Sequence, residues 1–335
     1  MVFALPYLKD LPYPNDSFII RAITIFLATL GNGTVIMIII FCLIWQKQMI
    51  GIGDQLHEFD GRFGAKLLGG STSSFHPLRT FVTIAVMIAI WTAVVIMELR
   101  YKNGIIYLIT SGLSQIFISW LLLQYSLMIN ALQYRFQKLN DTLLDATKTP
   151  IINENSHQER NPSVDRLIGE HLILVKQART RMFNVFKDIS RHYSFPVLVS
   201  IFHCCCCIVY DSYFYIVTAI KPATGSEIVE VFIESLFWIL MVSYPIVVLS
   251  ASVTTFQVEA YRTADVLYDI KEAFPSNKVI KSQVTNFAVE LLHRKVDISP
   301  YGLFSLDCTL LRTISGTMVT YLLFLVQFKA SESDL

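Results

Sequence analysis

The sequence predicts an all-α membrane protein with six transmembrane helices and a cytoplasmic helical anchor region. Of its 335 residues, 53% are apolar and 16% are charged, whereas an ordinary soluble domain is nearer 25% charged. The apolar residues lie in long blocks, several of which reach the roughly 20 residues that a helix needs to cross the hydrocarbon core. A net charge of +1 provides no strong basic field, so we expect a lipid membrane and no nucleic acid as a partner.

Six apolar blocks predict the six helices. They lie at 18–45, 81–97, 104–129, 196–220, 228–254 and 304–328. The link 221–227 has the length of a hairpin turn and contains Pro222 and Gly225, which are typical turn residues. We expect no secretory signal, because residues 1–17 contain three prolines and no apolar core of their own.

The Lys and Arg residues predict the orientation of these helices. The long segments 46–80, 130–195 and 255–303 contain 20 of the 27 Lys and Arg residues, and the segments on the opposite side contain five. The long segments are therefore expected to be cytoplasmic, with the C-terminus and the N-terminus both extracellular. This topology predicts a multi-pass protein of the plasma membrane.

The segments 130–195 and 255–303 are expected to form the cytoplasmic helical anchor. Within the first, apolar residues recur at steps of three and four, which is typical of an amphipathic helix. One face of a helix over 165–190 carries Ile168, Leu172, Val175, Met182, Phe186 and Ile189, with Arg179 filling the gap.

The last predicted helix carries one narrow polar stripe. Its residues, at spacings of 4, 3, 4 and 3, are Thr313, Thr317, Thr320, Phe324 and Gln327. Such a stripe is costly against lipid, so we expect it to face protein or water. Two interpretations stay open: the stripe lines an aqueous pore of a symmetric oligomer, or its threonines bond to neighbouring helices.

Ionisable and aromatic side chains in the outer parts of the helices form a candidate ligand-binding site. Asp211 and Glu234 are costly at membrane depth and are expected to face a cavity or a partner, and Arg21 is the nearest candidate cation. Aromatic residues at the same depth are Trp91, Tyr107, Tyr215 and Trp238. Together they frame a pocket for a small molecule, or else the aromatic residues form a belt at the lipid interface.

The run H-C-C-C-C at 203–207 contains residue types that bind metals, but we expect no metal site there. Consecutive helical residues point about 100° apart and do not converge on one tetrahedral ion, so buried thiols are the better interpretation. The sequence contains no nucleotide-binding loop, zinc-protease signature or nucleophile elbow. We therefore expect neither an enzyme nor a bound cofactor.

Two runs near the C-terminus resemble sequences of insect gustatory receptors. The run T-Y-L-L-F-L-V-Q-F at 320–328 resembles the family signature, and Y-G-L-F-S-L-D at 301–307 resembles the run that leads into the family's last helix. The resemblance implies that 1–335 is one gustatory-receptor-type membrane domain. It further implies that four subunits surround a cation pore, lined by the helix at 304–328. In that arrangement Gln327 and Phe328 are candidates for the gate.

Two departures from the family pattern qualify this expectation. Six crossings are predicted where the family has seven, so we match 18–45 to the family's second helix and expect the first to be absent from this sequence. Leu322 stands where the sugar-sensing branch typically has Glu, which disfavours a sweet receptor and favours the non-sugar branch.

The expected function is a gustatory receptor that is a ligand-gated, non-selective cation channel subunit. It would sense small non-volatile tastants, such as bitter or plant compounds, as a homo- or heterotetramer. The alternatives are an olfactory-type chemosensory channel subunit and a truncated, non-functional fragment. A G-protein-coupled receptor is disfavoured by the side on which the long loops lie, and a secondary transporter by the absence of an internal repeat in the sequence.

Overall fold

The computed structural model describes residues 18–67, 77–100, 104–152, 162–220, 225–274, 277–294 and 296–333. In chain order the elements are α2 (Phe18–Ile44), α3 (Gln46–Leu67), α4 (Pro77–Glu98), α5 (Gly104–Tyr107), η1 (Leu108–Gly112), α6 (Leu113–Ile152), α7 (Pro162–Ile220), α8 (Gly225–Ala273), α9 (Lys278–His293), η2 (Pro300–Gly302) and α10 (Cys308–Ser333). These described residues contain no β-strand, so the predicted all-α class is confirmed.

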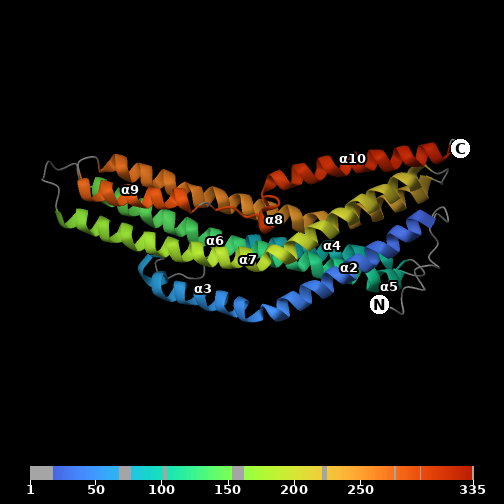
Figure 1. The fold of residues 1–335 in the computed structure, drawn as a ribbon, viewed down its shortest axis with the longest axis horizontal. Coiled ribbons are helices and arrows are strands. Elements are labelled where there is room, and N and C mark those ends of the chain that lie inside the picture. Colours follow the sequence, from blue (N-terminus) through green and yellow to red (C-terminus); the bar gives the residue numbers. More distant parts are fainter. Residues whose placement is uncertain are drawn as a thin grey trace.

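The helices form an elongated bundle with two unlike halves (Figure 1). One half contains α4, α5 and α10, and the other contains α9, while α7 and α8 run through both. We call the half built from α3, α9 and the adjoining parts of α6, α7 and α8 the helical body. The remaining half is the apolar half.

The outer helices of the apolar half carry apolar side chains that the protein itself leaves uncovered. Ile23–Ile44 in α2 has a mean hydropathy of 2.3 with 17% of its most apolar window buried, and Leu78–Glu98 in α4 has 2.4 with 11% buried. Soluble proteins rarely expose apolar patches of this size, so these faces are suited to lipid. Five of the described helices are long and apolar enough to cross a membrane, and Cys308–Phe324 in α10 is a shorter apolar helix.

Three of the predicted spans continue far beyond the boundaries that hydropathy indicated. The predicted helix 104–129 continues to Ile152 in α6, and the predicted helix 228–254 continues to Ala273 in α8. The predicted segments 165–190 and 196–220 form the single helix α7, with Pro196 inside it. Hydropathy marks only the apolar stretch, whereas each helix continues as an amphipathic one where it enters the helical body.

The segment 46–67 is helical, whereas the sequence reasoning assigned it only to a long loop. Its helix α3 buries one face, on which Ile52, Phe59 and Phe63 are 2%, 2% and 4% exposed. Two ion pairs attach it to the bundle: Arg135 on α6 donates to both oxygens of Asp60, at 3.0 and 2.6 Å, and Arg181 on α7 contacts Glu58 at 2.8 Å. Hydropathy did not reveal this helix, because the polar residues of one face balance the apolar residues of the other.

We expect the Arg135–Asp60 pair to stabilise the attachment of α3. Its side chains are 15% and 25% exposed, and a two-pronged charged contact of this kind contributes about 1–3 kcal/mol when one partner is removed. Arg135→Ala should therefore lower the thermal unfolding temperature of the purified protein. The matched control is Arg166→Ala, which removes a pair with Glu170 whose side chains are 83% and 63% exposed, and for which less than about 0.5 kcal/mol is expected. Equal effects of the two substitutions would contradict this account of α3.

The amphipathic stripe predicted for 165–190 is confirmed as a buried face of α7. Each of its seven residues is at most 6% exposed, including Arg179. The guanidinium of Arg179 donates to the carbonyl oxygen of Ala260 at 2.9 Å and lies over the ring of Phe136, 5.5 Å from its centre. The stripe is therefore covered by α6 and α8 of the same subunit.

A carboxylate fixes α9 to α7 in the helical body. Glu290 contacts Lys176 at 3.1 Å and accepts a hydrogen bond from the Thr180 hydroxyl at 2.9 Å, and Arg294 lies 3.1 Å away. Burial raises the pKa of Glu290, but these partners outweigh burial, and the pKa lies below the ordinary value. The contribution of this contact to stability is therefore present above the ordinary pKa of Glu and is lost as the pH falls through the lowered value.

Candidate ligand cavity and pore helix

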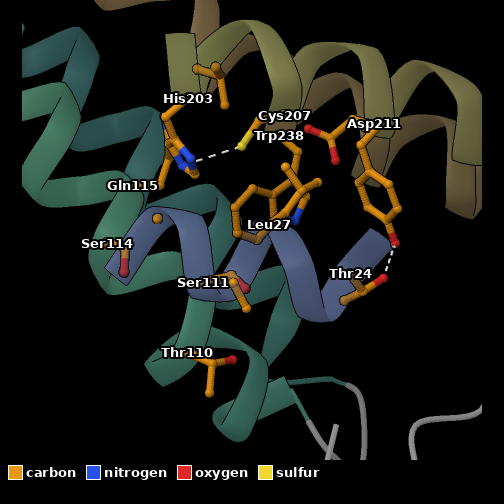
Figure 2. Close-up of a pocket in the computed structure, with 14 residues that line it drawn as sticks. Thr24, Leu27, Thr110, Ser111, Ser114, Gln115, His203, Cys207, Asp211 and Trp238 are labelled. Atoms are coloured by element: carbon orange, nitrogen blue, oxygen red, sulfur yellow. Dashed lines mark hydrogen bonds between the residues drawn. The ribbon is translucent and has the colours of Figure 1, made fainter. Parts of the chain in front are cut away.

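A small polar cavity lies between four helices of the apolar half (Figure 2). The space open to a water-sized molecule is about 30 Å³. Its lining residues are Thr24, Leu27, Ala28, Gly31, Thr110, Ser111, Ser114, Gln115, His203, Cys207, Tyr210, Asp211, Trp238 and Val242. Segments that are distant in sequence therefore meet at one place, which is where a binding site in a helix bundle is expected.

A π-helical turn forms one wall of the cavity. The turn η1 spaces its backbone differently from an α-helix, and such turns occur frequently at functional sites. Asn32 on α2 holds it, because its side-chain amide donates to the Thr110 carbonyl oxygen at 2.7 Å and its oxygen accepts from the Ser114 hydroxyl at 2.9 Å. These bonds fix the distance between α2 and α6 at the cavity.

The close approach of α2 to α7 depends on a glycine. A Cβ atom at Gly31 would lie 2.9 Å from Cε1 of His203, closer than such atoms pack. His203 is 4% exposed and its Nε2 lies 3.4 Å from Sγ of Cys207, one helical turn further along α7. Gly31 therefore allows the imidazole ring to lie against the α2 backbone at the edge of the cavity.

Three carboxyl groups gather at the other end of the cavity. Asp211 lines it, and Glu98 and Glu234 both lie within electrostatic range of Asp211. The Glu98 and Glu234 carboxyls are hydrogen-bonded to each other, and the indole N–H of Trp238 donates to Glu98 at 2.8 Å. In Figure 2, the Asp211 side chain projects from α7 near Trp238 and lies above α2 in the view.

The structure brings some of the predicted ligand-binding residues together and separates others. Asp211 and Trp238 line the cavity, and Glu234 lies beside it. Trp91 packs behind Trp238 in an apolar cluster, and Tyr215 lies away from the cavity against Phe232, with ring centres 5.2 Å apart. The backbones of Arg21 and Tyr107 lie in α2 and α5, but their side chains are outside the part that the structure describes.

Sequence reasoning missed three polar residues of this region. Glu98 ends α4 and was assigned to the turn after the predicted helix 81–97. Gln115 was hidden in the apolar block of α6, and His203 was considered only together with the cysteines that follow it. A polar residue inside an apolar block was the available signal, because such residues are costly unless a cavity or a partner receives them.

The four cysteines of the H-C-C-C-C run are distributed around the helix. Cys204 is fully buried and accepts from the Gln115 amide at 3.7 Å, whereas Cys207 lines the cavity. All six thiols of the chain are free. Within the residues that the structure describes, no three His, Cys, Asp or Glu side chains gather in a way that could hold a metal ion.

The polar stripe of α10 lies along an open groove of about 640 Å³. The groove is lined by Arg312, Thr313, Gly316, Thr317, Thr320, Tyr321 and Phe324, so four of the six predicted pore residues share it. Gln327 is exposed further along the helix, and the side chain of Phe328 lies outside the described residues. The structure thus leaves this face of α10 uncovered within one subunit.

The threonines of the stripe bond to their own helix. The hydroxyls of Thr313, Thr317 and Thr320 donate to the carbonyl oxygens four residues earlier, at 3.1, 2.9 and 3.0 Å. These bonds supply a partner for each hydroxyl hydrogen and leave the oxygen lone pairs toward the groove. The observed bonds are therefore within the helix and not to a neighbouring helix of the subunit.

A short linkage connects α8, which lines the cavity, to the start of α10. The Thr254 hydroxyl oxygen accepts from the backbone N–H of Cys308 at 3.0 Å. Asp307 caps the same helix end by accepting from the Thr309 N–H at 2.9 Å. The chain reverses just before, where Tyr301 and Gly302 have φ of 51° and 73°, a conformation that Gly adopts without strain. The Y-G-L-F-S-L-D run thus forms the reversal and the cap of α10.

Comparisons with known proteins identify the family and the fold of this chain. A family model described as 7tm Chemosensory receptor matches residues 1–332. The chain is similar to the putative gustatory receptors 28a and 28b of Drosophila melanogaster, with 24% identity over 253 residues and 27% over 148. These matches cover 66% and 43% of the chain, but only 55% and 31% of the length of the two receptors. A match to putative gustatory receptor 2a has 46% identity over 57 residues, which are 17% of the chain and 13% of that receptor.

A solved structure shares the fold. The insect olfactory receptor OR5 from Machilis hrabei, in complex with eugenol, superposes with a TM-score of 0.64, covering 97% of this chain and 85% of that one at 12% identity. The same receptor in a second structure gives a TM-score of 0.60 over 98% and 84%, at 10% identity. At this identity the likeness concerns the fold alone. Because the family model covers nearly the whole sequence, the chain belongs to the seven-transmembrane chemosensory receptor family, whose members cross the membrane several times.

Proposed function

We propose that this chain is a gustatory receptor subunit that forms a ligand-gated, non-selective cation channel and senses small non-volatile compounds of bitter or plant origin. The observation that carries the proposal is the pairing of a polar cavity with an uncovered polar face on α10 in one subunit. The cavity is the ligand site and the α10 face is the ion path. The similarity to gustatory receptors 28a and 28b supports taste as the sense.

An ion path requires several copies of the α10 face around one axis. The groove lies open in the isolated subunit, and a polar face at membrane depth is stable when it faces water. Four subunits, identical or mixed with related receptors, would place four stripes around one aqueous pore, with Gln327 and Phe328 at its outer end. The segments 130–195 and 255–303 would then form an anchor on the cytoplasmic side. The protein itself would lie in the plasma membrane with its C-terminus outside the cell.

The contact between α8 and α10 would couple a movement at the cavity to the pore helix. Trp238 and Val242 of α8 line the cavity, and Thr254 of the same helix caps α10. Between them Pro245 has no N–H to donate to the Met241 carbonyl oxygen, which instead accepts from the Ser119 hydroxyl at 3.5 Å. A movement of α8 at this weakened point would displace the start of α10.

We expect Thr254→Val to weaken the transmission from ligand to pore. Valine keeps the shape of threonine but cannot accept the Cys308 N–H, and a hydrogen bond of this kind contributes about 0.5–1.5 kcal/mol, which corresponds to roughly a 2- to 13-fold change in the opening equilibrium. The maximal current at saturating ligand should therefore fall while single-channel conductance stays constant. Thr255→Val is the control, because its hydroxyl donates only to Ala251 of its own helix, at 2.6 Å. Equal currents from the two variants would exclude this route.

The experiment that tests the proposal is reconstitution of the purified protein in a planar lipid bilayer without any G protein. Application of a panel of bitter plant compounds should produce cation currents that a planar bilayer without protein does not show. Eugenol belongs in the panel, because a response confined to volatile compounds would favour an olfactory-type subunit. Ligand responses that appear only in cells and depend on added G proteins would contradict the proposal.

A further inference from the structure

We infer that the cavity selects ligands that carry a positively charged amine, with the ammonium group seated at Asp211. The inference rests on the proposed function, since it assigns a ligand class to the cavity that serves as the ligand site. Three independent features of the described residues support it: an excess of negative groups, acceptors without donors, and aromatic walls.

The cavity end at Asp211 has carboxyl groups and no described cation. None of the residues that line the cavity is Lys or Arg, and no described residue donates a hydrogen bond to Asp211. Glu98 and Glu234 lie within electrostatic range and bring two further carboxyls to the same place. Asp211 is half-buried. A carboxylate that is partly withdrawn from water and has no partner is costly, so a bound cation would stabilise this arrangement.

Glu98 and Glu234 satisfy each other, which leaves Asp211 as the group that faces a ligand. A hydrogen bond between two carboxyls requires one proton shared between them, and the Trp238 N–H occupies a further acceptor position on Glu98. The pair therefore holds one negative charge behind the Trp238 ring. Of the three carboxyl groups, Asp211 is the one that lines the cavity.

The opposite end of the cavity contains two buried acceptors without a donor. Gln115 is 2% and His203 4% exposed, and both line the cavity. Among the described residues, neither Oε1 of Gln115 nor Nδ1 of His203 has a hydrogen-bond partner. An imidazole that donates from Nε2 to the Cys207 sulfur leaves Nδ1 as an acceptor. This end therefore requires a donor, which a hydroxyl group on the ligand supplies.

The spacing and the walls fit a small aromatic amine with a hydroxyl at its far end. His203 and Asp211 lie eight residues apart on α7, which corresponds to roughly 12 Å along the helix axis. Tyr210 and Trp238 line the cavity with aromatic rings, and such rings attract cations. A volume of about 30 Å³ accommodates an ammonium group, which is the size of a water molecule. The ring and hydroxyl of the ligand then extend from the ammonium group along the cavity toward Gln115 and His203.

Thermal unfolding of the purified full chain in detergent tests the inference without any current measurement. The probes are tyramine, which carries an ammonium and a hydroxyl, and 4-ethylphenol, which keeps the ring and hydroxyl and lacks the amine. Tyramine should raise the Tm in a concentration-dependent manner, and 4-ethylphenol should require at least about a ten-fold higher concentration. Asp211→Asn should raise the tyramine concentration for half the effect about ten-fold. Glu230→Gln is the control, because Glu230 is exposed and lies on α8 one helical turn before Glu234.

Each alternative outcome overturns the inference. Equal Tm curves for the two probes on the unsubstituted chain would show that charge is not recognised, and this comparison does not depend on whether Asp211→Asn folds. A tyramine effect that Asp211→Asn leaves unchanged would place the ammonium elsewhere. A rise in Tm with calcium chloride that requires Asp211 would assign the site to an inorganic cation. The unfolding experiment measures binding and not current, so the absence of current in the bilayer experiment would contradict the proposed function and not this inference. Currents evoked only by neutral compounds would contradict this inference and leave the proposed function intact.

Discussion

Leu172→Glu is expected to abolish the folded subunit. Leu172 is 2% exposed and lies in the buried stripe of α7, within the core cluster that joins α6, α7 and α8. The cation of the stripe, Arg179, lies seven residues further along α7 and is already held by the Ala260 carbonyl oxygen and the Phe136 ring. The glutamate would therefore be an unpaired buried charge, which costs roughly 4 kcal/mol or more. Since the whole stability of a protein of this kind is about 5–15 kcal/mol, the variant should be recovered only as aggregate in size-exclusion chromatography.

Ile173→Glu is the matched control for that substitution. Ile173 is the next residue of the same helix and is 44% exposed, so its glutamate reaches solvent and the subunit should fold. A loss of oligomer with retained folding in Ile173→Glu would locate a subunit contact on the outer face of the helical body. Recovery of well-folded Leu172→Glu would show that the stripe is not the core of the subunit.

Gly31→Ala and Gly33→Ala are expected to change stability in opposite directions. The Cβ atom at position 31 meets His203 at 2.9 Å, whereas at position 33 nothing lies within 4 Å. An added methyl group in a filled site costs about 1–3 kcal/mol, and the replacement of an unconstrained helical glycine by alanine gains about 0.5–1 kcal/mol. Thermal unfolding in the same detergent should therefore show a lower Tm for Gly31→Ala and a higher one for Gly33→Ala.

A combined variant identifies the clash. In Gly31→Ala with His203→Ala the alanine has room, so the cost of the first substitution should disappear relative to His203→Ala alone. A cost of Gly31→Ala that persists without the imidazole ring would show that α2 approaches another group at this point. The cavity geometry described above would then be wrong at its α2 wall.

The sequence predicted the fold where one property of the chain decided it. Long apolar blocks predicted the membrane helices, and the three- and four-residue spacing predicted the buried face of α7, including the position of Arg179 within it. The sequence reasoning did not predict α3, since a helix held by Ile52, Phe59 and ion pairs to α6 and α7 has an average composition. The sequence reasoning also underestimated the helix lengths, because the mean hydropathy falls where each helix becomes amphipathic.

The cavity was only partly accessible to sequence reasoning. Asp211, Glu234 and Trp238 were identified because charged and aromatic groups are conspicuous in apolar helices. Their arrangement was not, since the bond from Trp238 to Glu98 joins residues that are 140 positions apart. Tyr210 and Tyr215 lie on the same helix, but Tyr210 lines the cavity whereas Tyr215 packs against Phe232. The spacing of the residues alone did not reveal which face of α7 meets α2.

The measurement that tests the central claim most directly is chemical modification of Thr317→Cys in an open channel. The background carries Cys308→Ser, because Cys308 is the exposed cysteine of α10. A cationic methanethiosulfonate reagent adds a permanent positive charge at position 317, on the face that we assign to the pore. Val319→Cys is the control, since Val319 is 56% exposed on the same helix and points about 160° away from Thr317.

We predict that the reagent removes most of the cation current of Thr317→Cys and leaves that of Val319→Cys unchanged. Unchanged current in Thr317→Cys, or equal loss in both variants, would contradict the assignment of α10 as the pore helix.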